Sequence, residues 1–259
     1  MIPPNTQIVF VADLHLSADT CHLNVAFCHF ITELIQLPCL SALYVLGDWL
    51  DGWIGDDDYL SLSDDEKVRH WLTPIIEKLK TLSKKSNIYI MHGNRDFTIR
   101  QTLCNTFGGR LIKEPFYLNH QHINYRLEHG DALCTDDKKY QRYRKIIRHR
   151  LILWLLLKQP LHKRRQLALR IKHKAHQDKS QKSSRIMDTN PQAVADAFNT
   201  CDMLVHGHTH RPNVHKLDDK IRFVLGDWQD NFGQVSAMIG VLTDDKLSAY
   251  HWRWQNQTA

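Results

Sequence analysis

The sequence predicts an α/β fold in which the strands end in residues that can bind metal. Short runs of β-branched and aromatic residues recur along the chain and alternate with stretches whose apolar residues follow helical spacing. Most of these runs are followed at once by Asp, Asn or His beside Gly. In α/β folds, ligands collect at the carboxyl ends of the strands. We therefore expect the functional site at such an edge.

Six strands are expected, at residues 8–11, 43–46, 88–91, 123–127, 203–205 and 222–225. One helix is expected over residues 24–36, and a second from 64 to about 85, because acidic residues begin that stretch and lysines end it. Three more helices, over 137–158, 161–177 and 186–198, follow between the fourth and fifth strands. The pattern thus indicates an α/β scaffold that carries a helical insertion.

The composition is that of an ordinary globular protein. The 259 residues are 42% hydrophobic and 24% charged, and the chain is long enough to bury a sizeable core. The six cysteines form no Cys-x-x-Cys pair, which indicates free thiols. The first residues lack the basic and apolar regions of a secretory signal, so we expect a cytoplasmic location.

The positive charge is concentrated in the insertion. Residues 138–185 contain 17 Lys and Arg against one acid, Asp178, a net charge of +16 in a chain of net +6, which leaves −10 elsewhere. Residues 151–157 within it are all apolar, but a membrane-spanning helix needs roughly 20 such residues. The insertion could lie on an anionic surface, but it cannot cross a membrane.

Seven residues at the strand ends are candidate metal ligands. They offer only oxygen and nitrogen atoms, and they are Asp13, His15, Asp48, Asn94, His129, His206 and His208. Seven ligands are too many for one first-row ion but suit two ions that share a carboxylate. A mixed set without thiolate favours Mn²⁺, Fe²⁺, Co²⁺ or Zn²⁺ over Mg²⁺ alone. The residues themselves do not choose among these metals.

Five motifs in this order resemble the calcineurin-like metallophosphoesterase superfamily. They are Asp-x-His at 13–15, Gly-Asp at 47–48, Gly-Asn-x-Asp at 93–96, His-Gly-Asp at 129–131 and Gly-His-x-His at 207–210. The resemblance implies a four-layer α/β/β/α sandwich with a two-metal site. Gly-Asn-Arg-Asp at 93–96, Cys-Thr-Asp-Asp at 134–137 and Ile-Met-Asp at 186–188 are similar, more narrowly, to the UDP-2,3-diacylglucosamine hydrolase family of lipid A biosynthesis. That similarity runs from residue 10 to about residue 227.

The resemblance implies two metal ions, most simply Mn²⁺, held by two sets of ligands. One set is Asp13, His15, Asp48 and His208, and the other is Asp48, Asn94, His129 and His206, with Asp48 bridging. The implied reaction is attack of water on the α-phosphorus of an acylated UDP-glucosamine, which releases UMP and 2,3-diacylglucosamine 1-phosphate.

We expect Asp48 and Arg95 to act in catalysis. Many relatives in the wider superfamily have His where this chain has Arg95. Arginine cannot donate a proton at neutral pH, but it can hold phosphate and stabilise negative charge.

The residues expected to bind substrate are Asn94, Arg95, Asp137, Lys179, Lys182 and His206. Alignment on residues 186–188 places Ala175, Lys179 and Lys182 where the family has Ser, Asn and Lys, so only Lys182 agrees. The expected organisation is a core of residues 1–136 and 186–259 and a basic helical lid of residues 137–185.

The basic insertion has three interpretations: a solvated face, a site for nucleic acid, or a lid that meets a membrane and holds acyl chains. The third is favoured, because apolar residues lie beside cations and few aromatics accompany them. We therefore expect a peripheral protein on the cytoplasmic side of the inner membrane, with no nucleic-acid partner and no evident protein partner. The competing functions are a phosphodiesterase or nuclease for soluble nucleotides or nucleic acid, and a non-catalytic scaffold with a decayed metal site.

Four further polar residues have simpler expected roles. Asp96 and Asp131 would cap turns or orient ligands, His210 would lie next to the metals without binding them, and Asp227 would be a turn residue without a histidine partner.

Overall fold

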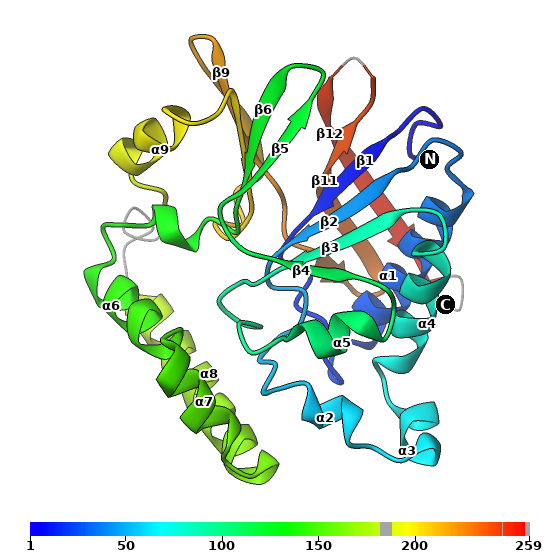
Figure 1. The fold of residues 1–259 in the computed structure, drawn as a ribbon, viewed down its shortest axis with the longest axis vertical. Coiled ribbons are helices and arrows are strands. Elements are labelled where there is room, and N and C mark those ends of the chain that lie inside the picture. The colour runs from blue at the N-terminus through cyan, green and yellow to red at the C-terminus, as the bar shows by residue number, and fades with distance from the viewer. Residues whose placement is uncertain (182–187, 245, 257–259) are drawn as a thin grey trace.

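The computed structural model describes residues 1–181, 188–244 and 246–256, and in 172–181 it describes the backbone alone. Two β-sheets pack face to face, and helices cover their outer faces (Figure 1). The expected α/β/β/α sandwich is confirmed.

The first sheet has seven strands. Its order is β10 (Gln229–Asn231), β11 (Gln234–Leu242), β1 (Ile8–Val11), β2 (Ala42–Leu46), β3 (Asn87–Met91) and β4 (Arg110–Ile112), and β12 (Leu247–Gln255) pairs with β11. Strands β1 to β4 are parallel, and β11 runs antiparallel to β1. The carboxyl ends of β1, β2 and β3 therefore lie at one edge.

The second sheet has five strands. Its order is β5 (Phe116–His120), β6 (Ile123–Leu127), β7 (Met203–His206), β9 (Lys220–Val224) and β8 (Asn213–Leu217). Strands β6, β7 and β9 are parallel, so their carboxyl ends also share an edge. All six expected strands are present, and the described residues form six further strands that were not predicted.

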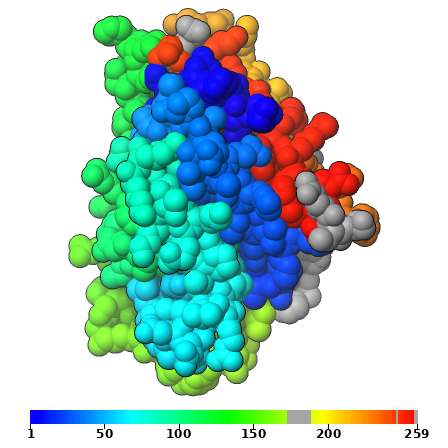
Figure 2. Space-filling model, turned by 90° about the vertical axis from the view of Figure 1, so that its right-hand side faces the viewer, coloured from blue at the N-terminus to red at the C-terminus, as the bar shows by residue number. Residues whose placement is uncertain are grey.

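Apolar side chains fill the space between the sheets and the space under the helices. Phe10, Tyr44, Leu127 and Phe223 are buried between the two sheets. Helices α1 (Cys21–Gln36), α4 (Thr73–Leu82) and α5 (Gln101–Asn105) cover the outer face of the first sheet. Figure 2 views this side, with the blue N-terminal segment between the cyan helices and the red C-terminal strands. Helix α9 (Pro191–Phe198) covers the second sheet.

Three of the predicted helices are wrong in their extent. The stretch from 64 to 85 forms two helices, α3 (Asp64–Arg69) and α4, because Pro74 lies in the first turn of α4 and cannot continue a preceding helix. Residues 137–158 likewise form α6 (Lys138–Ile147) and α7 (Arg150–Leu157). Helix α9 begins only at Pro191, where the Asn190 side chain accepts hydrogen bonds from the first turn.

The insertion consists of α6, α7 and α8 (Leu161–Gln181), which lie together and extend beside the sandwich (Figure 1). Two short elements outside the insertion lie near it: α2 (Asp57–Leu60) and the 3-10 helix η1 (Asp131–Leu133). Among the described residues, no helix combines the length and the apolar character that spanning a membrane would require.

Candidate metal centre

The carboxyl ends of the parallel strands of both sheets lie close together, and they bring the predicted metal ligands into one cluster. Asp13 and His15 follow β1, Asp48 follows β2, and Asn94 follows β3, whereas His129 follows β6 and His206 ends β7. Ligand atoms of Asp13, Asp48 and His129 all lie within 4.8 Å of one another. Such a group of buried carboxylates and imidazole has the donor set of a metal site.

Asp48 and Asn94 lie at the centre of the cluster. His15 Nδ1 is 3.8 Å from Asp48 Oδ2, and His129 Nε2 is 3.8 Å from Asp48 Oδ1. The Asn94 side-chain oxygen lies 3.1 Å from His129 Nε2 and 3.0 Å from His208 Nδ1. The carboxylate of Asp48 thus lies between imidazoles from the two sheets, as a bridging ligand would.

Backbone carbonyls fix the orientation of two imidazoles. His129 Nδ1 lies 3.0 Å from the Leu46 carbonyl oxygen, and His206 Nδ1 lies 2.9 Å from the Gly207 carbonyl oxygen. A carbonyl only accepts, so each Nδ1 carries the proton. Burial keeps the His206 ring neutral, which leaves the lone pair on its Nε2. At His129 the carboxylates of Asp48 and Asp13 outweigh burial and raise the pKa to about 9, so a bound cation would replace the proton on its Nε2. This arrangement is typical of histidines that bind metal.

Glycines in the motifs let the strand ends approach closely. A Cβ atom on Gly93 would lie 2.0 Å from Asp48 Oδ1, and one on Gly207 would lie 2.3 Å from Asp13 Oδ2. No side chain fits at these distances, so the Gly-Asn and Gly-His pairs are required for Asp48 and Asp13 to reach their places.

Five residues of the site adopt the left-handed backbone region that residues other than glycine rarely adopt. Asp13, His15, Asp48, His208 and His210 have φ between 51° and 68°. Hydrogen bonds hold these turns, because the His208 N–H donates to Asp13 Oδ2 at 2.7 Å and the Arg95 N–H donates to Asp48 Oδ1 at 2.7 Å. Such conformations persist only where the surroundings impose them, and they cluster at functional sites.

Burial sets the protonation of the ligands. It lowers the pKa of His15 and of His206 to about 4 and that of His208 to about 3, so these imidazoles are neutral at pH 7. Burial also raises the pKa of Asp48 to about 7, and the nearby carboxylates Asp96 and Asp13 add to the rise. A cation beside Asp48 would favour its charged form.

Two buried atoms of the cluster lack a hydrogen-bond partner among the described residues. They are Asp13 Oδ1 and His206 Nε2. Unpaired buried polar atoms are rare and costly, and here both are atoms of predicted ligands. Together with the neutral imidazoles and the buried carboxylates, they form a donor set that fits divalent cations.

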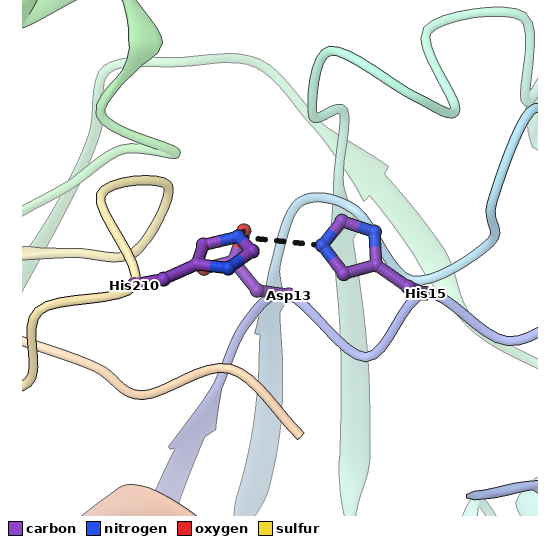
Figure 3. A group of neighbouring side chains, drawn as sticks. All are labelled: Asp13, His15 and His210. Atoms are coloured by element: carbon purple, nitrogen blue, oxygen red, sulfur yellow. Dashed lines mark hydrogen bonds and ion pairs between the residues drawn. The ribbon is translucent and has the colours of Figure 1, made fainter. Parts of the chain in front are cut away.

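His210 joins the cluster, and Asp227 accompanies it. His210 Nε2 lies 3.4 Å from His15 Nε2 and 3.6 Å from Asp13 Oδ1, and Figure 3 shows the two rings facing each other beside Asp13. On its other side, His210 Nδ1 lies 3.2 Å from Asp227 Oδ2. The expectation that Asp227 has no histidine partner is therefore wrong. The two residues are 17 positions apart, and the turn after β9 brings them together.

Asp96 supports the site as expected. Its carboxylate accepts from Gly93 N at 2.7 Å and from Trp49 N at 2.8 Å, and so joins the loops after β2 and β3.

Asp131 and Glu114 connect the site to the insertion. Asp131 Oδ2 accepts from Arg144 Nε at 2.8 Å, and Glu114 Oε1 accepts from Arg148 Nη1 at 2.7 Å. Arg148 also donates to the Gly93 carbonyl at 2.8 Å, and Glu114 accepts from the His129 N–H at 3.1 Å. Sequence reasoning missed this network. Its only signal was the spacing of the two arginines by one helical turn.

The predicted substrate residues lie in different settings. Arg95 is partly exposed beside the cluster, with Nη1 3.8 Å from Asp51 Oδ1. Asp137 caps α6 by accepting from the Tyr140 N–H at 3.0 Å. The Lys179 side chain and the whole of Lys182 lie outside the described residues.

Comparisons with known proteins match this arrangement. Residues 6–212 match the calcineurin-like phosphoesterase family. The chain is 39% identical over 222 residues to the UDP-2,3-diacylglucosamine hydrolase of Histophilus somni, covering 85% of this chain and 91% of that protein. It is 36% identical over 234 residues to the protein of the same name from Shewanella pealeana, covering 89% and 94%. The family match includes all seven predicted ligands.

Proposed function

The chain belongs to the calcineurin-like phosphoesterase family and, within it, to the UDP-2,3-diacylglucosamine hydrolases, and on this basis we propose that it hydrolyses the pyrophosphate bond of UDP-2,3-diacylglucosamine. The products would be UMP and 2,3-diacylglucosamine 1-phosphate. The buried cluster around Asp48, with His206 Nε2 unpaired and Asp13 Oδ1 3.6 Å from His210 Nε2 but without a hydrogen bond, carries the proposal for this chain.

We assign two divalent cations, preferably Mn²⁺, to the cluster. Asp13, His15, Asp48 and His208 would hold one, and Asp48, Asn94, His129 and His206 the other. When bound, such cations supply Lewis acidity, which polarises water and offsets the charge of phosphoryl oxygens. The low pKa values of His15, His206 and His208 support this assignment, because each ring has a free lone pair at neutral pH.

Arg95 would bind the phosphate that leaves with the sugar. Its backbone N–H donates to Asp48 Oδ1, which fixes the residue at the centre of the cluster, while its guanidinium is partly exposed. A guanidinium can hold phosphate through two hydrogen bonds but cannot release a proton at pH 7. A sugar phosphate is a good leaving group, so the reaction does not require a proton donor there.

The helices of residues 137–185 would act as a lid for the acylated sugar. Large apolar side chains are exposed on α7 and α8, among them Leu151 (64% exposed), Trp154 (51%) and Leu169 (58%). Cations lie next to them, and Lys158 Nζ is 3.8 Å from the centre of the Trp154 ring. Apolar surface bordered by cations suits acyl chains and anionic lipid, which supports a peripheral position on the cytoplasmic face of the inner membrane.

The proposal is tested by incubating the purified protein and Mn²⁺ with UDP-2,3-diacylglucosamine. We expect release of UMP, and we expect Asp48→Asn, which keeps the side-chain shape, to abolish it. In ¹⁸O-labelled water the label should appear in UMP, because water attacks the α-phosphorus. If the protein instead cleaves nucleic acid or soluble nucleotides rapidly and leaves the acylated substrate intact, the phosphodiesterase alternative replaces this proposal.

A further inference from the structure

A pocket of about 250 Å³ adjoins the metal centre on the second sheet. The pocket is lined by residues that are neighbours on the adjacent strands β7, β9 and β8. Val224 of β9 is paired with His206 of β7 on one side and with Asn213 of β8 on the other. Arg222 of β9 is paired with His215 of β8. The next residues along these strands, Val205 and Phe223, point into the core between the sheets. The pocket therefore lies on the outer face, with the candidate ligand His206 as one wall.

Arg222 brings a guanidinium to the pocket. Its Nη1 donates to Thr189 Oγ1 at 2.5 Å, and its Nε is buried without a partner among the described residues, so a ligand in the pocket would meet the other N–H groups of the guanidinium. Guanidinium N–H groups only donate, so they suit a ligand that carries a carbonyl or a similar acceptor.

The other walls suit a nucleoside better than a second phosphate. The charge of Arg211 is paired with Asp188, whose Oδ2 lies 2.6 Å from Arg211 Nη1. Burial and the neighbouring Arg222 charge lower the pKa of His215, so this ring adds no positive charge at pH 7. The wall also includes the apolar Val224 and the amide of Asn213. A planar ring with carbonyl groups can stack on guanidinium or imidazole and hydrogen-bond to such a wall.

The position of the pocket suits the nucleotide half of the substrate. The insertion contacts the core at Gly93, Glu114 and Asp131, near β3, β5 and β6, whereas the pocket lies on β7, β9 and β8. Across the second sheet, β5 and β6 come first, and β7 and β9 follow. The ligands His129, after β6, and His206, on β7, therefore lie between the contacts of the insertion and Arg222 on β9. A substrate with its α-phosphorus at the cluster and its lipid at the insertion would extend its nucleoside toward the pocket.

We propose that this pocket binds the uridine of the substrate, with the Arg222 guanidinium donating to a carbonyl oxygen of the base. The inference rests on the proposed function, because that function supplies a uridine nucleotide as part of the substrate and as the product. Arg222 is then a specificity residue for the base.

Calorimetric binding of UMP to the Mn²⁺-loaded protein tests the pocket without turnover. Arg222→Met should weaken UMP binding by about tenfold or more, since hydrogen bonds from charged groups contribute that much. Ribose 5-phosphate, which lacks the base, should bind wild type and variant equally. Arg253→Met, at an exposed arginine on β12, is the matched control and should leave UMP binding unchanged. Asn213→Trp should block the pocket without touching Arg222.

The outcomes separate this inference from the proposed function. Unchanged UMP affinity in both Arg222→Met and Asn213→Trp, with Mn²⁺ content and thermal unfolding as in wild type, overturns the pocket even if the acylated substrate is hydrolysed. Equal weakening of UMP and ribose 5-phosphate by Arg222→Met also overturns it, since Arg222 would then bind phosphate. Dependence of UMP affinity on Arg222 supports the pocket even in a protein that leaves the acylated substrate intact.

Discussion

Three imidazoles that alternate along one short stretch have three different environments. His206 donates to the Gly207 carbonyl and leaves Nε2 unpaired, His208 lies 3.0 Å from the Asn94 oxygen, and His210 lies against Asp227. Their pKa values differ accordingly. Burial lowers the pKa of His206 and His208, whereas at His210 the carboxylates of Asp13 and Asp227 outweigh burial and raise the pKa to about 10.

These environments predict different effects of substitution. His206→Ala and His208→Ala should each abolish hydrolysis, and each should lower the bound Mn²⁺ by one ion, because the two rings are assigned to different metals. His210→Ala should retain measurable activity and both ions. Activity assays paired with elemental analysis distinguish the three variants. An equal loss of activity and metal in all three would contradict the assignment.

At the scale of elements, the insertion is tied to the core at two places along its length. Near the site, Arg144 of α6 and Arg148, which directly follows α6, bind Asp131 and Glu114. Farther away, Arg164 of α8 is only 3% exposed, and Nη1 donates to the Ile54 carbonyl at 2.6 Å and to Asp57 Oδ1 at 2.8 Å. These contacts hold α7 and α8 beside the sandwich.

Loss of the Arg164 contact should affect the lipid substrate selectively. Arg164→Ala should raise the KM for UDP-2,3-diacylglucosamine by about tenfold, the scale of one charged hydrogen bond. Hydrolysis of bis(para-nitrophenyl) phosphate, which has no acyl chain, should change little. Arg165→Ala is the matched control, because Arg165 is 59% exposed and pairs with Asp58 at the surface. A parallel loss on both substrates would assign Arg164 to the stability of the core instead.

The sequence predicted the elements whose residues are uniformly buried and missed others. Strands β1 and β2 are buried along their whole length, so they appear as unbroken apolar runs. Strand β8 is mostly exposed and gave no such run. The break between α6 and α7 falls at residues 148–149, where neither Gly nor Pro marks it. The Asp227 to His210 pair was not visible either, since only the tertiary fold creates it.

At the scale of the whole molecule, acidic and basic residues are separated. Residues 138–185 carry 17 of the 34 Lys and Arg residues, and the rest of the chain has net negative charge, with Asp13 and Asp48 buried in it. Burial raises the pKa of Asp48, and the charges of Asp96 and Asp13 add to the rise, so without cations the ionised carboxylate of Asp48 is costly. Metal binding should therefore stabilise the whole fold.

Thermal unfolding with and without metal measures this stabilisation. Mn²⁺ at about 100 times its Kd adds about 2.7 kcal/mol, which for a chain of this size raises the Tm by about 5 to 10 °C. A chelator should reverse this rise in Tm. Asp48→Asn should show most of the same fall in Tm without any chelator. A Tm that does not respond to Mn²⁺ in the wild-type protein would mean that the cluster does not bind it.

The pairing of β1 with β11 determines when this site can form during synthesis. Ile8 is paired with Leu242, near the other end of the chain, and the Trp228 N–H donates to the Asp13 carbonyl at 3.1 Å. The ribosome releases β1 first, but one side of this strand remains unpaired until β11 emerges. Contacts so distant in sequence form slowly. Chains truncated or stalled before β11 therefore lack the neighbour of β1, and Leu242 is missing from the core between the two sheets.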